Sequence, residues 1–241
     1  THGTDTREET AFFLNLAEGS RKPVVLTGAM RPSTAISPDG PRNLYNAVRV
    51  ASEAAAQGRG VMVVMDDEIL GADDIQKTHT LAVGTFQNPN YGPLGYIYGG
   101  APYFTRESLK RHTYQSEFSL DGIAELPAVC VVTAYAGADA KFVNILLRSD
   151  TKGIVLAGVG NGNASSQVIE ALATARQEGI VVVRSSRIPQ GPTTQWNEVD
   201  DDALGFAASW HHTPQRARIL LMMALTITND TGEIQRIFNE Y

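Results

Sequence analysis

Short apolar runs alternate with amphipathic segments along most of the chain, a pattern typical of proteins built from βαβ units. The apolar runs predict five buried strands, at residues 24–27, 60–65, 128–135, 153–159 and 180–186. The amphipathic segments predict helices at residues 9–20, 44–57, 139–148, 167–177, 214–226 and 232–241. This alternation indicates parallel sheets with helices on both faces.

Two helices carry more detailed expectations. Thr6 and Glu9 have the spacing of a capping box at the start of the first helix. In the second helix, 3.6-residue periodicity predicts one buried apolar face formed by Leu44, Ala47, Val48, Ala51 and Ala55.

The alternating pattern breaks in the middle of the chain. Residues 66–102 are rich in turn signals such as "QNPNYGPLG" and predict hairpins and turns. Residues 105–127 are polar and aperiodic, and we interpret them as a linker. The chain is therefore expected to contain an N-terminal α/β domain at 1–104 and a C-terminal one at 128–241.

Composition narrows the class of protein without naming it. The chain has 241 residues, 43% of them hydrophobic, and a formal net charge of −6, which disfavours a nucleic-acid partner. No apolar run approaches the length of a membrane span. Cys130 is the one cysteine, so no intrachain disulfide is expected, and its sequence context predicts a buried strand position.

Polar clusters that could carry chemistry follow several predicted strands, where ligands of open sheets bind. They are the opening "THGTDT", the loop "GAMRPSTAISPDG", Lys77 in "GADDIQKTHT", and Glu198 in "TTQWNEVDDD". A lysine buried beside a hydroxyl could act as a base. Taken one at a time, each cluster also fits an ordinary turn, surface loop or solvated charge.

The segment "AGVGNGNASS" raises the alternative of a dinucleotide site. Its glycines follow G-x-G-x-G and not the expected G-x-G-x-x-G. The next strand ends in Arg184 and Ser185 without an acidic residue for a ribose, although Arg184 could suit a phosphorylated ribose. The histidines lack partners at metal-ligand spacing, so no metal site is predicted.

Taken together, the motifs resemble one family. "THGTDTREETAFFL", "GAMRPSTAISPDGPRNLYNAV", "KTHT", "GVGNGN", "VVRSSRIPQG" and "TTQWNEVDD" are similar in order and spacing to bacterial type II L-asparaginases, which include the glutaminase-asparaginases. The resemblance implies a flavodoxin-like N-terminal domain and a smaller Rossmann-like C-terminal domain. It also implies a homotetramer of intimate dimers, no cofactor, and a periplasmic or secreted protein, with a cytoplasmic one as the alternative.

The activity implied by this resemblance is hydrolysis of the side-chain amide of L-asparagine, and often of L-glutamine too, to the acid and ammonia. Thr4 corresponds to a catalytic threonine that acts with Lys77 and Asp5. It either attacks the amide or orients the attacking water. Asp5 also pairs with the substrate ammonium.

The remaining substrate-binding positions implied by the resemblance come from other loops. The backbone N–H of Ala29 would donate to the developing oxyanion. Asn163 and Glu198 would reach the substrate from a neighbouring subunit. The family's disulfide is not expected, because Ser20 stands at its partner position.

The family also carries a T-G-G-T-I motif with a first catalytic threonine, and this motif is not found in the 241 residues. We therefore expect activity to require a segment preceding Thr1. Two alternatives remain: an inactive or complementing fragment of such an enzyme, and an ammonia-supplying amidase subunit of an amidotransferase.

Overall fold

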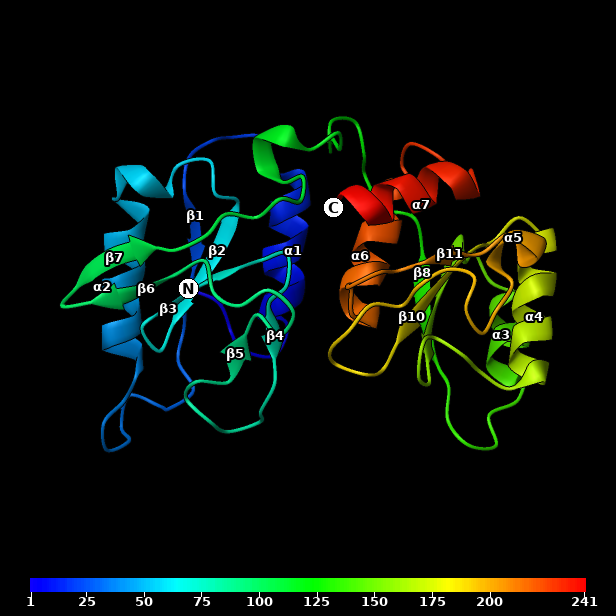
Figure 1. Cartoon of the computed structure of the whole chain (residues 1–241), viewed down its shortest axis with the longest axis horizontal. Coiled ribbons are helices and arrows are strands. Elements are labelled where there is room, and N and C mark those ends of the chain that lie inside the picture. The colour runs from blue at the N-terminus through cyan, green and yellow to red at the C-terminus, as the bar shows by residue number, and fades with distance from the viewer. The chain divides into compact units, whose positions relative to one another are not determined.

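A computed structural model describes all 241 residues, which fold into two compact units, Thr1–Glu117 and Phe118–Tyr241 (Figure 1). The division falls inside the stretch interpreted as a linker. The first half of that stretch is bonded to the N-terminal unit, because the guanidinium of Arg106 donates to the carbonyl of Gly92 at 3.0 Å. The domain limits at 104 and 128 remain a proposal.

The N-terminal unit contains two helices, α1 (Arg7–Ala17) and α2 (Gly40–Ala51), and the short 3-10 helices η1 (Ala54–Ala56) and η2 (Thr113–Gln115). Its main sheet has the order β1-β2-β3-β6-β7, formed by Val24–Leu26, Val61–Met65, Glu68–Gly71, Gly95–Tyr98 and Ala101–Phe104. A separate hairpin joins β4 (Gln76–Lys77) and β5 (Phe86–Gln87). Only β1 and β2 pair in parallel. The expectation of a parallel sheet is thus wrong for the rest of this unit, while the hairpins predicted within 66–102 are confirmed.

Strand β2 places α1 and α2 on opposite faces of the sheet. Val61, Val63 and Met65 belong to the cluster that packs with Ala11 of α1. Met62 and Val64 belong to the cluster that contains Ala47 and Val50 of α2. Successive strand residues point to opposite faces, so a wholly apolar strand needs a cover on each side. The result is a three-layer unit, visible in Figure 1 as a sheet between two helices.

The details expected for the two helices differ from the structure. Helix α2 buries Asn43 and Asn46, while Leu44 and Val48 are 49% and 60% exposed, so the predicted apolar face is wrong. The asparagines can be buried because the amide of Asn43 donates to the carbonyl of Gly28 and that of Asn46 to Asp67. The capping box at α1 is not formed, since the Thr6 side chain makes no capping bond.

The C-terminal unit is the βαβ structure that its periodicity predicts. Its sheet is wholly parallel, in the order β11-β10-β9-β8, formed by Ala207–Ala208, Val181–Ser186, Gly153–Gly158 and Val129–Thr133. Its helices are α3 (Lys141–Leu146), α4 (Ser166–Gln177), α5 (Asp201–Leu204), α6 (Pro214–Ala224) and α7 (Thr231–Glu240). Cys130 lies on the edge strand β8 and is half-buried.

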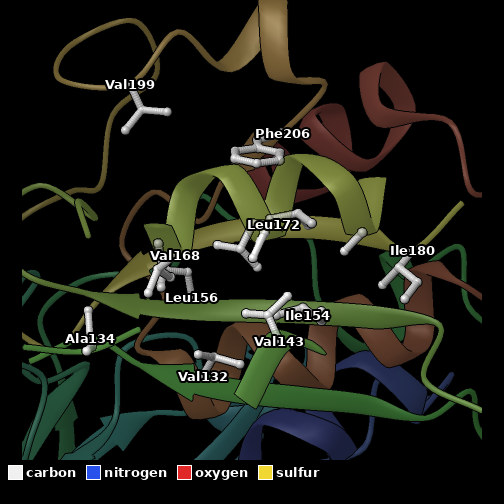
Figure 2. Packing of buried hydrophobic residues seen from close by; sticks show 14 residues of the cluster. Val132, Ala134, Val143, Ile154, Leu156, Val168, Leu172, Ile180, Val199 and Phe206 are labelled. Carbon is white, nitrogen blue, oxygen red and sulfur yellow. The ribbon is translucent and has the colours of Figure 1, made fainter. Parts of the chain in front are cut away.

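Helices cover both faces of this sheet. On one face, Ile154 and Leu156 of β9 pack with Leu172 of α4 and with Phe206 (Figure 2). On the other, α6 approaches β9 so closely that a Cβ at Gly153 would lie 2.8 Å from a methyl carbon of Leu221. No helix of either unit reaches the length and apolarity needed to cross a bilayer. No group of three or more histidine, cysteine, aspartate or glutamate residues is placed to hold a metal ion.

Candidate active site

The opening loop lies beside the end of strand β1. The backbone N–H of His2 donates to the carbonyl of Thr27 at 2.9 Å, one residue past the strand. The imidazole Nδ1 of His2 lies 2.7 Å from the carbonyl of Gly3, and its Nε2 lies 3.0 Å from the hydroxyl of Thr10. A carbonyl only accepts, so Nδ1 carries a proton and donates to Gly3, while Nε2 is hydrogen-bonded to the Thr10 hydroxyl. This network ties the loop to helix α1.

The buried guanidinium of Arg7 is hydrogen-bonded to the same opening loop. Arg7 is fully buried, donates to the carbonyl of His2, and stacks over the ring of Phe86 at 5.0 Å. Burial lowers the pKa of Arg7 to about 10, while the carboxylate of Asp39 acts to raise it. A Cβ at Gly28 would overlap the Arg7 guanidinium. Only glycine therefore fits at the start of the "GAMRP" loop.

Thr4, Asp5 and Lys77 meet at one end of the N-terminal sheet. The Lys77 ammonium donates to the Thr4 hydroxyl at 3.0 Å and to the Asp5 carboxylate at 3.1 Å. Lys77 lies on β4, and its backbone N–H donates to the carboxylate of Glu8 in the first turn of α1 at 2.8 Å. The Lys77 side chain is 20% exposed and that of Asp5 is 93% exposed. The β4–β5 hairpin thus carries the lysine to the opening loop.

A pocket of about 630 Å³ opens beside these groups, lined by Asp5, Lys77, Thr78, His79 and Thr80. One oxygen of Asp5 is engaged by Lys77 and the other has no bond within the chain, so the carboxylate can hold a second cation. An amine in contact with both a hydroxyl and a carboxylate can transfer a proton to or from either group. This arrangement suits attack on a carbonyl carbon next to a bound ammonium group.

The loop that carries Ala29 is held by the carboxylate of Asp39. The N–H groups of Met30 and Arg31 both donate to it at 2.9 Å, and the amide of Asn43 donates at 3.1 Å. The N–H of Ala29 makes no bond within the chain and remains available as a donor. Asp39 carried no signal in the sequence beyond its place before a helical segment.

Asp39 is expected to make stability depend on pH. Partial burial acts to raise the pKa of Asp39, but the backbone N–H groups of Met30, Arg31 and Asp39 and the amide of Asn43 outweigh it and hold that pKa below its usual range. Its contribution is therefore complete above the unfolded-state pKa, about 3.9, and is lost as the pH falls through the lower folded-state value.

Asp39→Asn should destabilise the protein by about 1 kcal/mol at pH 7, after allowance for solvent screening, and lower the melting temperature by roughly 2–4 °C. The difference from the parent protein should shrink between pH 5 and about pH 3. Thermal unfolding of both proteins at pH 7 and at about pH 3 measures this difference in stability. Asp150→Asn, at an exposed carboxylate without a side-chain bond, is the matched control. A difference that stayed constant with pH would contradict the ionic role of Asp39.

Asn163 and Glu198 form a second group, in the C-terminal unit. The amide of Asn163 donates to the carboxylate of Glu198 at 2.7 Å. Asn163 closes a tight turn after β9 by pairing with Val159, and Glu198 stands exposed on the loop after β10. Two loops from neighbouring strand ends thus present an amide and a carboxylate together.

A buried ion pair locks these two loops to each other. The fully buried Arg184 bonds both oxygens of the fully buried Asp201, at 2.5 and 2.6 Å. It also donates to the carbonyls of Asn161 at 3.0 Å and Thr194 at 2.9 Å. The Asn161 side chain bonds the backbone N–H and the hydroxyl of Thr194, both at 2.8 Å. Sequence analysis missed Asp201 because it stands in an acidic run that looks solvated.

The structure rejects the dinucleotide alternative for this turn. The Arg184 guanidinium is consumed by Asp201 and by carbonyls, so it cannot serve a ribose phosphate. The glycines are needed for close packing: a Cβ at Gly158 would lie 2.5 Å from the carbonyl carbon of Gly162, and one at Gly162 would lie 2.6 Å from Thr193.

Comparisons with known proteins cover both units. The family model "Asparaginase, N-terminal" matches residues 1–110, and "Glutaminase/Asparaginase C-terminal domain" matches residues 128–238. The chain is 52% identical to L-asparaginase 2 of Escherichia coli (strain K12) and 50% identical to the probable periplasmic L-asparaginase of Haemophilus influenzae. Each alignment covers 100% of this chain and 69% of the relative.

A third relative is named for two activities. The glutaminase-asparaginase of Pseudomonas fluorescens biotype A is 45% identical over 242 residues, covering 100% of this chain and 67% of the relative. The similarity spans both units and every motif that builds the two residue groups described above. The chain therefore belongs to the family of L-asparaginases and glutaminase-asparaginases.

Proposed function

We propose that the protein hydrolyses the side-chain amide of L-asparagine, and that of L-glutamine as a second substrate, to the acid and ammonia. The observation that carries this proposal is the contact of the Lys77 amine with both Thr4 and Asp5 at the edge of a pocket. Relatives named as asparaginases and glutaminase-asparaginases support it. Ammonia release from free asparagine by the purified protein, with any segment that precedes Thr1 included, tests it. Release only in the presence of a partner protein would instead favour an ammonia-supplying subunit.

The chemistry follows from the three groups. In its neutral form, the Lys77 amine accepts a proton from the Thr4 hydroxyl. The hydroxyl oxygen, or a water molecule that it holds, then bonds the amide carbon. The proton on Lys77 passes to the departing nitrogen as the C–N bond breaks, and ammonia leaves. If water attacks, this step releases the acid directly; if Thr4 attacks, it leaves an ester on Thr4, which a water molecule then hydrolyses to release the acid and restore the Thr4 hydroxyl. The free N–H of Ala29 donates to the negative oxygen that develops in this step.

Substrate selection rests on charge. The unoccupied oxygen of Asp5 would bind the α-ammonium of the amino acid. Glu198, held by Asn163, supplies a second carboxylate, and we propose that it does so from a neighbouring copy in a homotetramer of paired dimers. Two carboxylates around one ammonium favour α-amino acids over simple amides, which have no cation to bind.

The shared site can be tested by subunit exchange. Glu198→Ala should weaken the use of asparagine by about ten- to a hundredfold, because a hydrogen bond to a charged group is lost. A mixture of Thr4→Val and Glu198→Ala proteins should regain roughly a quarter of wild-type activity after random exchange across a two-fold interface. Mixing Thr4→Val with Asp150→Ala, which leaves Glu198 intact on every chain, should keep about half of the wild-type activity before and after exchange, and it controls for losses caused by the exchange procedure.

One outcome of the exchange experiment would contradict a site shared between subunits. If mass spectrometry shows mixed oligomers and their activity stays at the level of the separate variants, Glu198 does not act across the interface. The hydrolase proposal would survive that result, because it rests on Thr4, Lys77 and Asp5.

For the location, we propose the periplasm. The Haemophilus influenzae relative is named as periplasmic, and the E. coli relative is an L-asparaginase 2. Osmotic-shock fractionation followed by immunoblotting tests this, and recovery of the protein with cytoplasmic markers would contradict it.

A further inference from the structure

The chain has two tryptophans, and both line one pocket of the C-terminal unit. The pocket has a volume of about 440 Å³. Besides Trp196 and Trp210, its lining consists of neutral residues: Thr194, Gln195, Ala208, Gln235 and Asn239. Thr194, Gln195 and Trp196 lie in the motif "TTQWNEVDD", whose proposed substrate-binding residue is Glu198. Trp210, Ala208, Gln235 and Asn239 lie outside the motifs named above and outside the residue groups of the proposed hydrolase site.

Both tryptophans have an unusual backbone. Their φ angles are +57° for Trp196 and +55° for Trp210, a left-handed conformation that bulky residues rarely adopt. Trp210 is held by two backbone bonds to Thr193, at 2.9 and 3.2 Å. The backbone N–H of Trp196 donates to Asp201 at 3.3 Å and its indole N–H to Asp202 at 2.9 Å. Such strain persists where neighbours enforce it, and it is common at ligand sites.

The indole rings are accessible. Trp196 is 68% exposed and Trp210 is 39% exposed. The ring contact of Trp210 is with His211, edge-on at 5.3 Å, and not with Trp196. The strained backbone therefore presents two separate aromatic surfaces to one cavity and does not bury them against each other.

The polar lining favours a cation over an anion. The side-chain amide of Gln235 is already hydrogen-bonded within the protein: its oxygen accepts from the N–H of Ala208, and its nitrogen donates to the carbonyl of Ala208. No lining side chain is charged. The indole N–H of Trp196 contacts the Asp202 carboxylate, while the cation nearest in sequence, Arg236, is paired with Glu233 and Glu240. Asp200 on the same loop is also acidic. Indole faces attract cations, and a negative surrounding potential strengthens that attraction.

We propose that this pocket binds an organic ammonium cation between the indole faces of Trp196 and Trp210. The cation carries alkyl groups, which pack on the apolar lining, and its charge lies over the indole faces. The aliphatic stems of Gln235 and Asn239 and the methyl of Ala208 complete the apolar surround. The ligand is held without any direct ion pair, so affinity in the millimolar range is expected.

Binding of a ligand in this pocket can be followed by intrinsic fluorescence. Because both tryptophans of the chain line it, intrinsic tryptophan fluorescence reports its occupancy directly. Choline and 3,3-dimethylbutan-1-ol have nearly the same shape, but only choline is charged. Titration of the intact protein with choline should give a saturable fluorescence change and a saturable calorimetric heat. The neutral alcohol should bind at least tenfold more weakly.

Variants separate the aromatic and ionic contributions. Trp210→Leu and Trp196→Leu should each weaken choline binding by about tenfold or more, since a cation–π contact is removed. Asp202→Asn retains an acceptor for the Trp196 indole and should weaken binding only a few-fold. Melting temperatures close to that of the parent show that the variants are folded. Tyr98→Leu, at an exposed aromatic of the N-terminal unit, is the matched control and should bind choline normally.

Several results would overturn the proposal. Equal binding of choline and the neutral alcohol would make the pocket merely apolar. Absence of a saturable response in the folded parent would exclude the site. A fluorescence change on dilution without ligand, together with a change in oligomeric state, would show that a second copy covers the two tryptophans.

Discussion

Thr4→Val should abolish asparagine hydrolysis while leaving the protein folded. Valine has nearly the shape of threonine but lacks the hydroxyl that lies 3.0 Å from the Lys77 amine. Loss of a nucleophile or proton-transfer partner should lower turnover by on the order of 10²-fold or more. Coupled detection of released ammonia measures the effect, and circular dichroism monitors the fold.

Two further variants give this prediction its controls. Lys77→Met should lower turnover and leave the Michaelis constant nearly unchanged, because in the proposed mechanism the amine moves a proton and does not bind substrate. Thr174→Val should retain full activity, since its hydroxyl bonds only the Glu170 carbonyl on the surface of α4. A Thr4→Val protein that kept more than about a tenth of the parent's turnover would remove Thr4 from the chemistry.

Arg184→Leu should unfold or severely destabilise the C-terminal unit. The variant leaves the fully buried Asp201 carboxylate without its counter-charge and removes donors from the carbonyls of Asn161 and Thr194. Breaking a buried ion pair costs about 3–5 kcal/mol, a large share of a typical total stability of about 5–15 kcal/mol. Urea unfolding measures the free energy of unfolding, and Asp201→Asn should show a loss of the same order.

The exposed ion pairs of Arg236 provide a comparison for the buried pair of Arg184 and Asp201. Arg236 bonds Glu233 and Glu240 on one face of α7, and its side chain is 34% exposed. Arg236→Leu should cost less than about 1 kcal/mol, because exposed ion pairs contribute little. If Arg184→Leu cost no more than Arg236→Leu, the lock between the two loops would not exist.

Arg184→Lys separates loop positioning from bulk stability. Lysine keeps the positive charge for Asp201 but cannot reproduce the fork that also reaches Asn161 and Thr194. A folded Arg184→Lys protein should therefore show a raised Michaelis constant for asparagine, because the loop that carries Glu198 is less well held. An unchanged Michaelis constant would limit Arg184 to a structural role.

Strands β9 and β10 of the C-terminal unit could be predicted from sequence because they are buried on both faces. A strand such as β9 reads as an unbroken apolar run, since helices cover each side of a parallel sheet. The inner face of α2 could not be predicted in this way. Asn43 and Asn46 are tolerated in the interior only because Gly28 and Asp67, from other parts of the chain, accept from their amides.

The same distinction holds for the candidate site. The residue types and motif spacing in the sequence determined the family and pointed to Thr4, Asp5 and Lys77. Their mutual contact was decided by the tertiary structure, since Thr4 and Lys77 are 73 positions apart and meet through the β4–β5 hairpin. Likewise, the acidic run around Asp201 has the composition of a solvated loop. Burying one of its carboxylates is energetically possible only where the fold delivers the guanidinium of Arg184 to it.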